Sequence, residues 1–243
     1  MGYNGVYGFV RHKFQPVLVL IGKVKTVLKS TELWVYFGIV ATSVGIITLN
    51  IYPLIKNVAD CLRLSSFQVA SIISTTGYAT TDFNLWPSLS KAVILILMIV
   101  GGCAGSTAGG LKVSRCVILF RLIKSELRHS LHPNSVSVVK FEGKKVEKSV
   151  LTNVSIYFAI YILCLFSTFL LLSIEPFDME TNLTAAFTCF NNVGPGLGAV
   201  GPTSNFSAYS DFSKVIMSIA MLLGRLEIFP IIIALSPSTW AKK

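Results

Sequence analysis

The sequence predicts an all-α integral membrane protein made of two similar units, each a membrane span, a short re-entrant segment and a second span. The 243 residues are 53% hydrophobic and only 13% charged, with a mean hydropathy of +0.69. Ordinary soluble domains are less apolar and more highly charged. A stretch rich in glycine, Gly101–Gly110, interrupts one apolar run. The long apolar runs are Leu33–Ile51, Ala92–Val100, Val150–Ile174 and Val215–Leu235.

Three of these four runs are close to the length that a membrane span needs, which is about 20 residues. The run Ala92–Val100 is the exception, because it crosses only if its helix begins near Pro87 and continues into the glycine-rich break. We therefore expect four spans, the second of them broken by an intramembrane loop at Gly101–Gly110.

The distribution of basic residues predicts the orientation of the chain. Of the 21 Lys and Arg residues, five lie in Arg11–Lys29, nine in Lys112–Lys148 and two at the end of the chain. Pairs of spans separate these segments, so all three fall on one side, which the positive-inside rule makes cytoplasmic. We expect a multi-pass protein of the inner (plasma) membrane with both termini cytoplasmic. The net charge of +10 then orients the chain, and no nucleic-acid partner is expected.

The segments that face the other way are mildly acidic. This balance suggests attraction of cations at an outer mouth, although the same charges could serve only to orient the protein. The acidic residues are Asp60, Asp82, Glu175, Asp178, Glu180 and Asp211, and the basic ones are Lys56, Arg63, Lys91 and Lys214.

No arrangement of residues typical of an enzyme is found. The five cysteines lack the paired spacing of metal ligands and are interpreted as small buried residues without disulfides. The three histidines lie in basic segments with no partner Asp, Ser or Cys pattern. The N-terminus lacks the layout of a signal peptide. We expect a protein that is not an enzyme and binds no cofactor.

The chain contains an internal repeat. In each half a span is followed by a short amphipathic segment and a turn containing glycine, and then by a second span. The short segments are Ser65–Ser74 and Asn182–Asn191, followed by turns at Thr75–Asp82 and Asn192–Gly198. A shift of 117 residues aligns Thr76 with Val193 and Gly77 with Gly194.

The short segments are about ten residues each, roughly 15 Å of helix and half a bilayer. Because each is entered from outside and followed by a span that starts outside, we predict re-entrant pore helices. Their C-terminal ends carry partial negative charge, which favours a cation, and the turn beyond presents carbonyl groups to the ion. Gly77 and Gly194 allow the unusual backbone angles of such turns. The alternative is two extracellular loops with ordinary turn glycines.

The stretch Gly101–Gly110 predicts non-helical backbone at membrane depth, which is tolerated only inside protein or along a water-filled path. Its small residues allow close approach of backbones and easy rearrangement. The alternative is a small-residue surface for helix packing. A nucleotide-binding loop is excluded because Leu111 and Lys112 stand where Lys and Ser or Thr are required. The sequence thus favours a permeation pathway.

Arg225 and Glu227 lie inside the last apolar run. Charges at that depth are costly and usually face a cavity or a partner. The alternative for Arg225 is a side chain that extends to the membrane surface. Lys112 and Arg115 are expected to mark the cytoplasmic end of the broken helix, and contact with the pore is the alternative.

Four stretches carry a resemblance to a known family: STTGYATTDF (74–83), GGCAGSTAGGLKVSR (101–115), FNNVGPGLGAVGP (190–202) and LGRLEIFP (223–230). From about Lys25 to its end the chain resembles bacterial Trk-type potassium-uptake membrane subunits, within the Trk/Ktr/HKT superfamily. Members of that family have four units of span, pore loop and span around one pore. This chain has two, similar to the third and fourth.

The resemblance implies four segments. Residues 1–30 are a cytoplasmic N-terminal segment and residues 31–120 a pore unit similar to the third family repeat. Residues 121–148 form a basic cytoplasmic loop, and residues 149–243 resemble the fourth repeat. The missing half could reflect a truncated or split reading frame, a mis-called gene start, or a protein that pairs with another half.

The resemblance also assigns the ion-binding and gating residues. Main-chain carbonyls would be the main ligands of potassium, the only metal expected. The side chains of Thr75, Asn191 and Asn192 either hold the turns by hydrogen bonds or are ordinary turn residues. The selectivity filter comprises Thr75, Thr76, Gly77, Tyr78, Asn192, Val193, Gly194 and Pro195. The gate comprises Gly101, Gly102, Gly105, Ser106, Thr107, Gly109, Gly110 and Arg225.

The resemblance implies potassium uptake by a pore-forming subunit. It implies that a cytosolic, nucleotide-binding regulatory subunit docks on the cytoplasmic face, where the basic loop Arg121–Lys148 is a candidate contact. Membrane lipids with anionic headgroups are a second candidate there. Four pore loops would require a second copy or an N-terminal half. The alternative function is a transport-incompetent fragment that is inert or modulates a full-length transporter.

Overall fold

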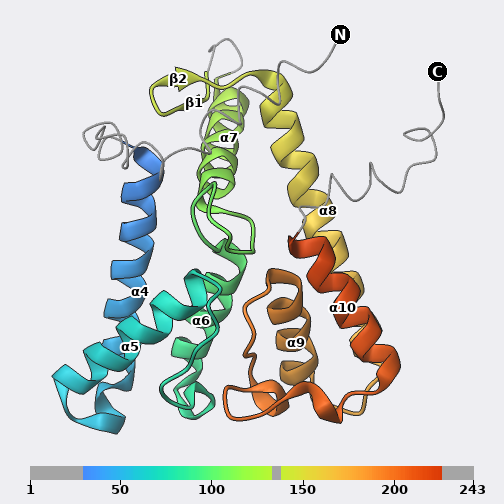
Figure 1. Ribbon diagram of the computed structural model, residues 1–243. Helices are drawn as coiled ribbons and strands as arrows, with labels where there is room; N and C mark the ends of the chain where they lie inside the picture. Colours follow the sequence, from blue (N-terminus) through green and yellow to red (C-terminus); the bar gives the residue numbers. More distant parts are fainter. Residues whose placement is uncertain (1–29, 133–137, 226–243) are drawn as a thin grey trace.

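The structure is a computed structural model that describes residues 30–132 and 138–225. Most of the described residues lie in α-helices (Figure 1). The helices are α4 (Thr31–Ile55), α5 (Val58–Ile73), α6 (Ser88–Val100), α7 (Val113–Leu131), α8 (Lys148–Leu172), α9 (Met179–Asn191) and α10 (Asp211–Arg225). Short 3₁₀ helices are η2 (Phe83–Leu85), η3 (Gly198–Val200) and η4 (Phe206–Ala208), and an antiparallel hairpin pairs β1 (Lys140–Phe141) with β2 (Lys144–Lys145).

Helices α4 and α8 are long and apolar enough to cross a membrane. Each has 25 residues, or about 37 Å of helix, and their most apolar windows have mean hydropathies of 1.7 and 2.3. Helix α6 has only 13 residues, and α7 follows it after a non-helical loop. Figure 1 shows α6, this loop and α7 running one after another along the length of the molecule.

The two halves of the chain follow the same path. A shift of 117 residues aligns both ends of α4 with those of α8, because it takes Thr31 to Lys148 and Ile55 to Leu172. In Figure 1 each long helix runs away from the hairpin, a shorter helix (α5 or α9) returns part of the way, and an extended segment then leads back to the next helix. The predicted order of elements in the repeat is therefore present.

The short helices begin earlier than the sequence pattern indicated. Pro53 removes a backbone donor in the last turn of α4, and the helix ends at Ile55 with Lys56 in the left-handed conformation. The Asn57 side chain then accepts the N–H of Ala59 at 3.1 Å and caps α5. This cap starts α5 seven residues before the predicted Ser65, and α9 likewise starts before Asn182.

Each half has its own apolar core, and the second turn joins them. In the first half, residues such as Ile47, Ile72 and Ile94 bring α4, α5 and α6 together, and Val193 and Leu197 of the second half pack into the same cluster. The two halves are therefore packed against each other where the short helices end.

Polar side chains fasten these apolar helices to one another. The Asn50 side-chain oxygen accepts the Ser90 hydroxyl at 2.7 Å and the Ser90 N–H at 3.2 Å, which links α4 to α6. The hydroxyls of Thr48 and Ser65 lie 2.6 Å apart and link α4 to α5. Such bonds satisfy polar groups that would be costly in an apolar surrounding.

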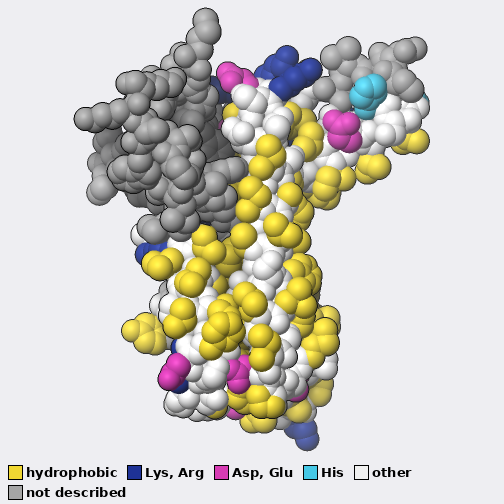
Figure 2. Space-filling model, turned by 90° about the vertical axis from the view of Figure 1, so that its right-hand side faces the viewer, with side chains coloured by type: hydrophobic (Ala, Val, Ile, Leu, Met, Phe, Trp, Pro, Cys, Tyr) yellow, Lys and Arg dark blue, Asp and Glu magenta, His cyan; other side chains and the backbone are white. Residues whose placement is uncertain are grey.

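The outer surface suits a lipid environment. Figure 2 shows hydrophobic side chains over most of the length of the visible helices, with most of the charged side chains near the two ends. Large apolar side chains such as Leu49, Phe120 and Leu170 are more than two-thirds exposed. The surface of a soluble protein rarely exposes so much apolar area.

Glu175 anchors the start of α10 at the end of the molecule opposite the hairpin. Its carboxylate accepts the Ser213 hydroxyl at 2.6 Å, the Ser210 N–H at 3.1 Å and the Ser210 hydroxyl. These hydrogen bonds hold the pKa of the Glu175 carboxyl below its ordinary value, and the bond from the Ser210 hydroxyl has the largest effect, followed by that from Ser213.

This lowered pKa predicts a pH dependence of stability. The contribution of Glu175 is present above the pKa of the unfolded chain and is lost as the pH falls through the folded pKa. We expect Glu175→Gln to lower the Tm of the detergent-solubilised protein at neutral pH, and the gap to wild type to close below about pH 4. The control is Glu126→Gln, at an exposed site on α7. A gap that persisted unchanged at low pH would contradict the role of the carboxylate.

Candidate functional site: two turns and the loop beneath them

The first turn folds back on the end of α5. Thr75 (φ 55°) and Gly77 (φ 79°) both have left-handed backbone conformations. The Thr76 N–H donates to the Ser71 carbonyl at 2.9 Å, and the Ser71 hydroxyl donates to the Tyr78 carbonyl at 2.5 Å. The predicted filter residues 75–78 therefore form one compact turn.

The second turn repeats this geometry at the end of α9. Asn192 (φ 55°) and Gly194 (φ 113°) have positive φ, as Thr75 and Gly77 do at the shift of 117 residues. The Val193 N–H donates to the Thr188 carbonyl at 3.0 Å, and Thr188 is the counterpart of Ser71 at the same shift. The Gly194 N–H donates to the Thr188 hydroxyl at 2.9 Å. The two turns share a backbone pattern although their side chains differ.

The two turns lie against each other. A Cβ atom on Gly77 would overlap the carbonyl oxygen of Val193, and one on Gly194 would lie 3.7 Å from the Gly77 Cα. Only glycine fits at Gly77, where both the space and the positive φ exclude a side chain.

The outer parts of the two turns remain open to solvent in this chain. Tyr78 is 72% exposed, and Thr76 and Gly194 are exposed too, whereas Val193 is buried and Pro195 is half-buried. The two turns thus carry a packed side and an accessible side.

The segments beyond the turns also join the two halves. The Asn84 side chain exchanges two hydrogen bonds with the backbone of Gly198: Gly198 N–H donates to it at 3.0 Å, and its amide donates back at 3.2 Å. The Lys91 ammonium lies 3.5 Å from the Glu180 carboxylate. These contacts hold the two turns in a fixed position relative to each other.

Two asparagines hold the second turn, in line with one of the two roles the sequence left open. The Tyr161 hydroxyl of α8 donates to the Asn191 side chain at 2.7 Å, and that side chain donates to the Phe187 carbonyl at 2.9 Å. The Asn192 side chain donates to the Met221 carbonyl of α10 at 3.0 Å. Tyr161 was missed from the sequence, because a tyrosine within an apolar run gives no signal of its own.

The glycine-rich stretch forms a closed loop between α6 and α7. Helix α6 ends at Val100, and the N–H groups of Leu111 and Lys112 donate to the carbonyls of Ile99 and Val100 at 2.9 and 3.0 Å. Gly101 (φ 65°) and Gly110 (φ 81°) touch backbone to backbone at its base. Gly102 and Gly109 are buried with them, whereas Gly105, Ser106 and Thr107 are exposed at the tip.

Three glycines from three elements converge on the end of α9. A Cβ atom on Gly224 of α10 would overlap the Phe190 carbonyl oxygen, and one on Gly109 of the loop would overlap that of Asn191. Gly77 covers Val193 in the same way. Gly224 was not singled out from the sequence, although it lies within the LGRLEIFP stretch.

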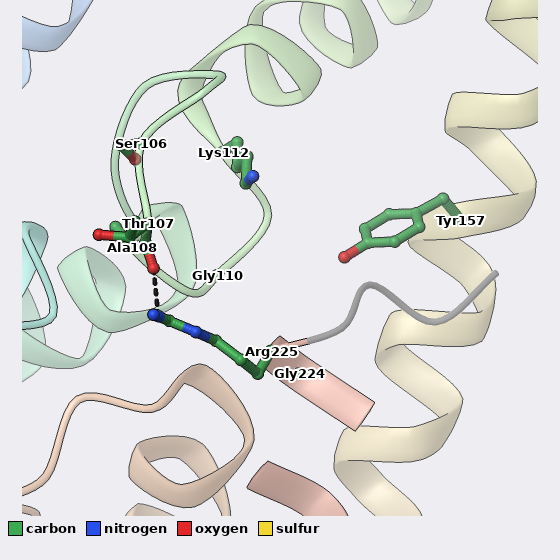
Figure 3. A pocket seen from close by; sticks show the side chains of 8 residues that line it. All are labelled: Ser106, Thr107, Ala108, Gly110, Lys112, Tyr157, Gly224 and Arg225. Carbon is green, nitrogen blue, oxygen red and sulfur yellow. Dashed lines mark hydrogen bonds between the residues drawn. The ribbon is translucent and has the colours of Figure 1, made fainter. Parts of the chain in front are cut away.

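The loop also contacts the first turn and Arg225. The Gly109 N–H donates to the Thr75 hydroxyl at 3.3 Å. Figure 3 shows the Arg225 side chain reaching from the end of α10 to the loop, where its guanidinium donates to the Thr107 carbonyl.

Glu227 lies outside the described residues, as does the end of the predicted span Val215–Leu235.

A pocket of about 110 Å³ lies where the loop, α8 and α10 meet. Figure 3 shows Arg225 and Lys112 approaching this pocket from different elements, with Tyr157 on the α8 side. The Arg115 guanidinium lies 4.0 Å from the centre of the Tyr157 ring, a cation–π contact that ties α7 to α8. The lining residues are Ser106, Thr107, Ala108, Gly110, Lys112, Tyr157, Gly224 and Arg225.

Within residues 30–132 and 138–225, no group of three or more His, Cys, Asp or Glu side chains could hold a metal ion. The five cysteines are free thiols.

An apolar helical repeat with paired glycine turns and a non-helical loop fits a membrane protein of the ion-transport class, and the comparisons with known proteins give the same class. The sequence matches the TrkH family, described as cation transport protein, over residues 5–242. The chain therefore belongs to the TrkH family, as the resemblance of its motifs predicted.

Individual relatives agree with this assignment. The chain is 38% identical to the potassium uptake protein TrkG of Escherichia coli over 72% of its length and 36% of that protein. It is 33% identical to TrkH of Salmonella typhimurium over 89% of its length and 45% of that protein. The relatives are potassium uptake proteins by name, which fits a transporter and not an enzyme.

The structure resembles the crystal structure of the potassium transporter TrkH from Vibrio parahaemolyticus. The TM-score is 0.81 at 32% sequence identity, and the match covers 88% of this chain and 46% of that one. This likeness supports an all-α membrane protein. The chain spans less than half the length of each of these relatives.

The glycine packing at the end of α9 predicts a stability effect. We expect Gly109→Ala to destabilise the folded protein by about 1–3 kcal/mol, because the new methyl group overlaps the Asn191 carbonyl. The measurement is thermal or denaturant unfolding in detergent. Gly45→Ala is the matched control, since a Cβ atom there meets nothing within 4 Å. Equal stability of the two variants would contradict the packing.

Proposed function

We propose that this chain forms part of the ion pathway of a potassium uptake transporter, with the two glycine-containing turns as half of a selectivity filter. The observation that supports this most strongly is the repeated turn geometry. Thr75 with Gly77 and Asn192 with Gly194 have the same backbone pattern and lie side by side. Backbone carbonyls arranged around an axis can replace the hydration shell of a cation.

In this proposal α5 and α9 are re-entrant pore helices. With 16 and 13 residues they are about 20–24 Å long, which is too short for the roughly 30 Å hydrocarbon core. Both end at a filter turn, so the negative ends of their dipoles lie beside the proposed ion site. A cation is favoured there and an anion is not.

The protein lies in the inner membrane in this proposal, and the hairpin end of the molecule faces the cytoplasm. Lys140, Lys144 and Lys145 lie in the hairpin, and basic residues are retained on the cytoplasmic side. The opposite end carries Glu175, Asp178 and other acids, which attract cations to the outer mouth.

The proposed gate is the loop Gly101–Gly110 with Arg225. The loop contacts the first filter turn at Thr75 and the end of α9 at Asn191, and Arg225 binds its Thr107 carbonyl. A positive charge below a cation filter raises the electrostatic barrier to permeation. Movement of the loop away from Arg225 would lower that barrier and open the path.

A complete filter needs further turns from outside this chain. The chain spans 36–46% of the length of the named relatives, so a second copy or an N-terminal half would supply them. The basic hairpin and α7 are the proposed contact for a cytosolic nucleotide-binding regulatory subunit and for anionic lipids. Potassium is the transported substrate, and no cofactor or nucleic acid takes part.

Potassium-dependent growth and rubidium uptake test the proposal in a strain that lacks its own potassium transporters. We expect uptake when this chain is expressed alone or with an N-terminal half, the former indicating assembly from two copies. Gly77→Val should abolish uptake while membrane insertion stays normal, because its side chain overlaps the Val193 carbonyl.

Gly45→Ala is the control for this experiment and should retain uptake. Unchanged uptake in Gly77→Val would exclude Gly77 from the filter. Failure of uptake in both expression formats, with insertion confirmed, would instead support the transport-incompetent alternative.

Arg225 provides a separate test of the gate. We expect Arg225→Ala to raise basal rubidium flux, because the positive charge is lost and the bond to Thr107 is broken. Arg225→Lys retains the charge and should leave basal flux close to wild type. A fall in flux with normal expression of Arg225→Ala would show that the residue is structural.

A further inference from the structure

We propose that Glu32 positions the glycine-rich loop, and that Ser30 and Glu142 tie this position to the β1–β2 hairpin. The proposal rests on the gating role given above to the loop. Glu32 lies in the first turn of α4 and is only 2% exposed. Its carboxylate accepts the Ala104 N–H at 2.6 Å, a contact between residues 72 positions apart in the chain.

The helix start by itself does not account for a buried carboxylate. An acidic residue in a first turn interacts favourably with the helix dipole, but this interaction is small compared with the cost of burying a charge. Burial of the charge is costly unless hydrogen bonds compensate for it. At Glu32 the Ala104 N–H of the loop provides part of that compensation, so the contact stabilises both the carboxylate and the loop.

The composition of the loop explains why a charged residue elsewhere is needed. Residues 101–110 contain only Gly, Cys, Ala, Ser and Thr. Because the loop has no charged side chain, its neighbours bind mainly its backbone N–H and carbonyl groups. Glu32 takes a backbone N–H at Ala104, and Arg225 gives hydrogens to the backbone carbonyl at Thr107. Opposite charges from α4 and α10 thus hold peptide groups three residues apart near the loop tip.

A second contact connects this anchor with the hairpin. The Ser30 hydroxyl donates to the Glu142 carboxylate at 2.7 Å, and Ser30 is 4% exposed. Glu142 and Gly143 form the turn between β1 and β2. The hairpin is itself held to α7, where the Arg121 guanidinium donates to the Lys140 carbonyl.

The result is a continuous physical route from the hairpin to the loop. In Figure 1 the start of α4 and the hairpin lie at the same end of the molecule. Displacement of the hairpin by a bound partner would move Ser30, and the helix would carry Glu32 with it. The loop would then lose or gain its anchor at Ala104 without any contact between the partner and the loop.

Hydrogen–deuterium exchange in the purified full chain tests this directly. We expect Glu32→Ala to speed exchange of the loop peptide 101–110 by about tenfold at short labelling times, since local opening sets the exchange rate. Glu32→Gln keeps an acceptor oxygen and should restore most of the protection. Glu126→Ala on α7 is the matched control and should resemble wild type.

Glu142→Ala tests the hairpin connection and is expected to speed exchange in the same loop peptide, whereas Lys144→Ala in the same hairpin should not. Unchanged loop exchange in Glu32→Ala would overturn the proposal, as would an equal rise in the α9 peptide, which would indicate general loosening. Unchanged exchange in Glu142→Ala would remove the hairpin from it.

Rubidium flux, measured on the same variants, distinguishes this proposal from the gating role on which it rests. Faster loop exchange with higher basal flux supports both. Faster loop exchange without any change in flux would retain Glu32 as the residue that positions the loop and reject the loop as a gate.

Discussion

The arrangement of the site depends on close backbone packing at the C-terminal end of α9. Carbonyl groups there lack helical partners, and those of Phe190, Asn191 and Val193 are each covered by a glycine from a different element. Gly224, Gly109 and Gly77 bring α10, the loop and the first turn within reach. A single added methyl group at any of them meets backbone, which cannot move aside as a side chain can.

This packing explains why the filter turns and the loop are mechanically linked in the proposed mechanism. The loop contacts the first turn through the Thr75 hydroxyl and the helix end before the second turn through the Asn191 carbonyl. Its far side is held by Glu32 and Arg225, which bind its backbone. A loop without charged side chains thus occupies one position because its neighbours supply the polar groups.

Much of the fold was predictable from the sequence because the repeat and the apolar runs are local signals. The shift of 117 residues that aligned Gly77 with Gly194 also aligns α4 with α8 residue for residue. The break at Gly101–Gly110 was predictable because so many glycines cannot sustain a helix. The starts of α5 and α9 were placed too late, since their caps precede the amphipathic pattern.

The sequence by itself determined the class of protein, the order of elements and the glycines of the turns, because hydropathy, periodicity and glycine content act over a few neighbouring residues. Only the tertiary structure decided which groups meet. Glu32 with Ala104, Tyr161 with Asn191 and Gly224 with Phe190 are pairs from distant segments. Their contacts arise when long helices pack, and no local pattern of residues encodes which carbonyl or N–H will lie opposite a given side chain.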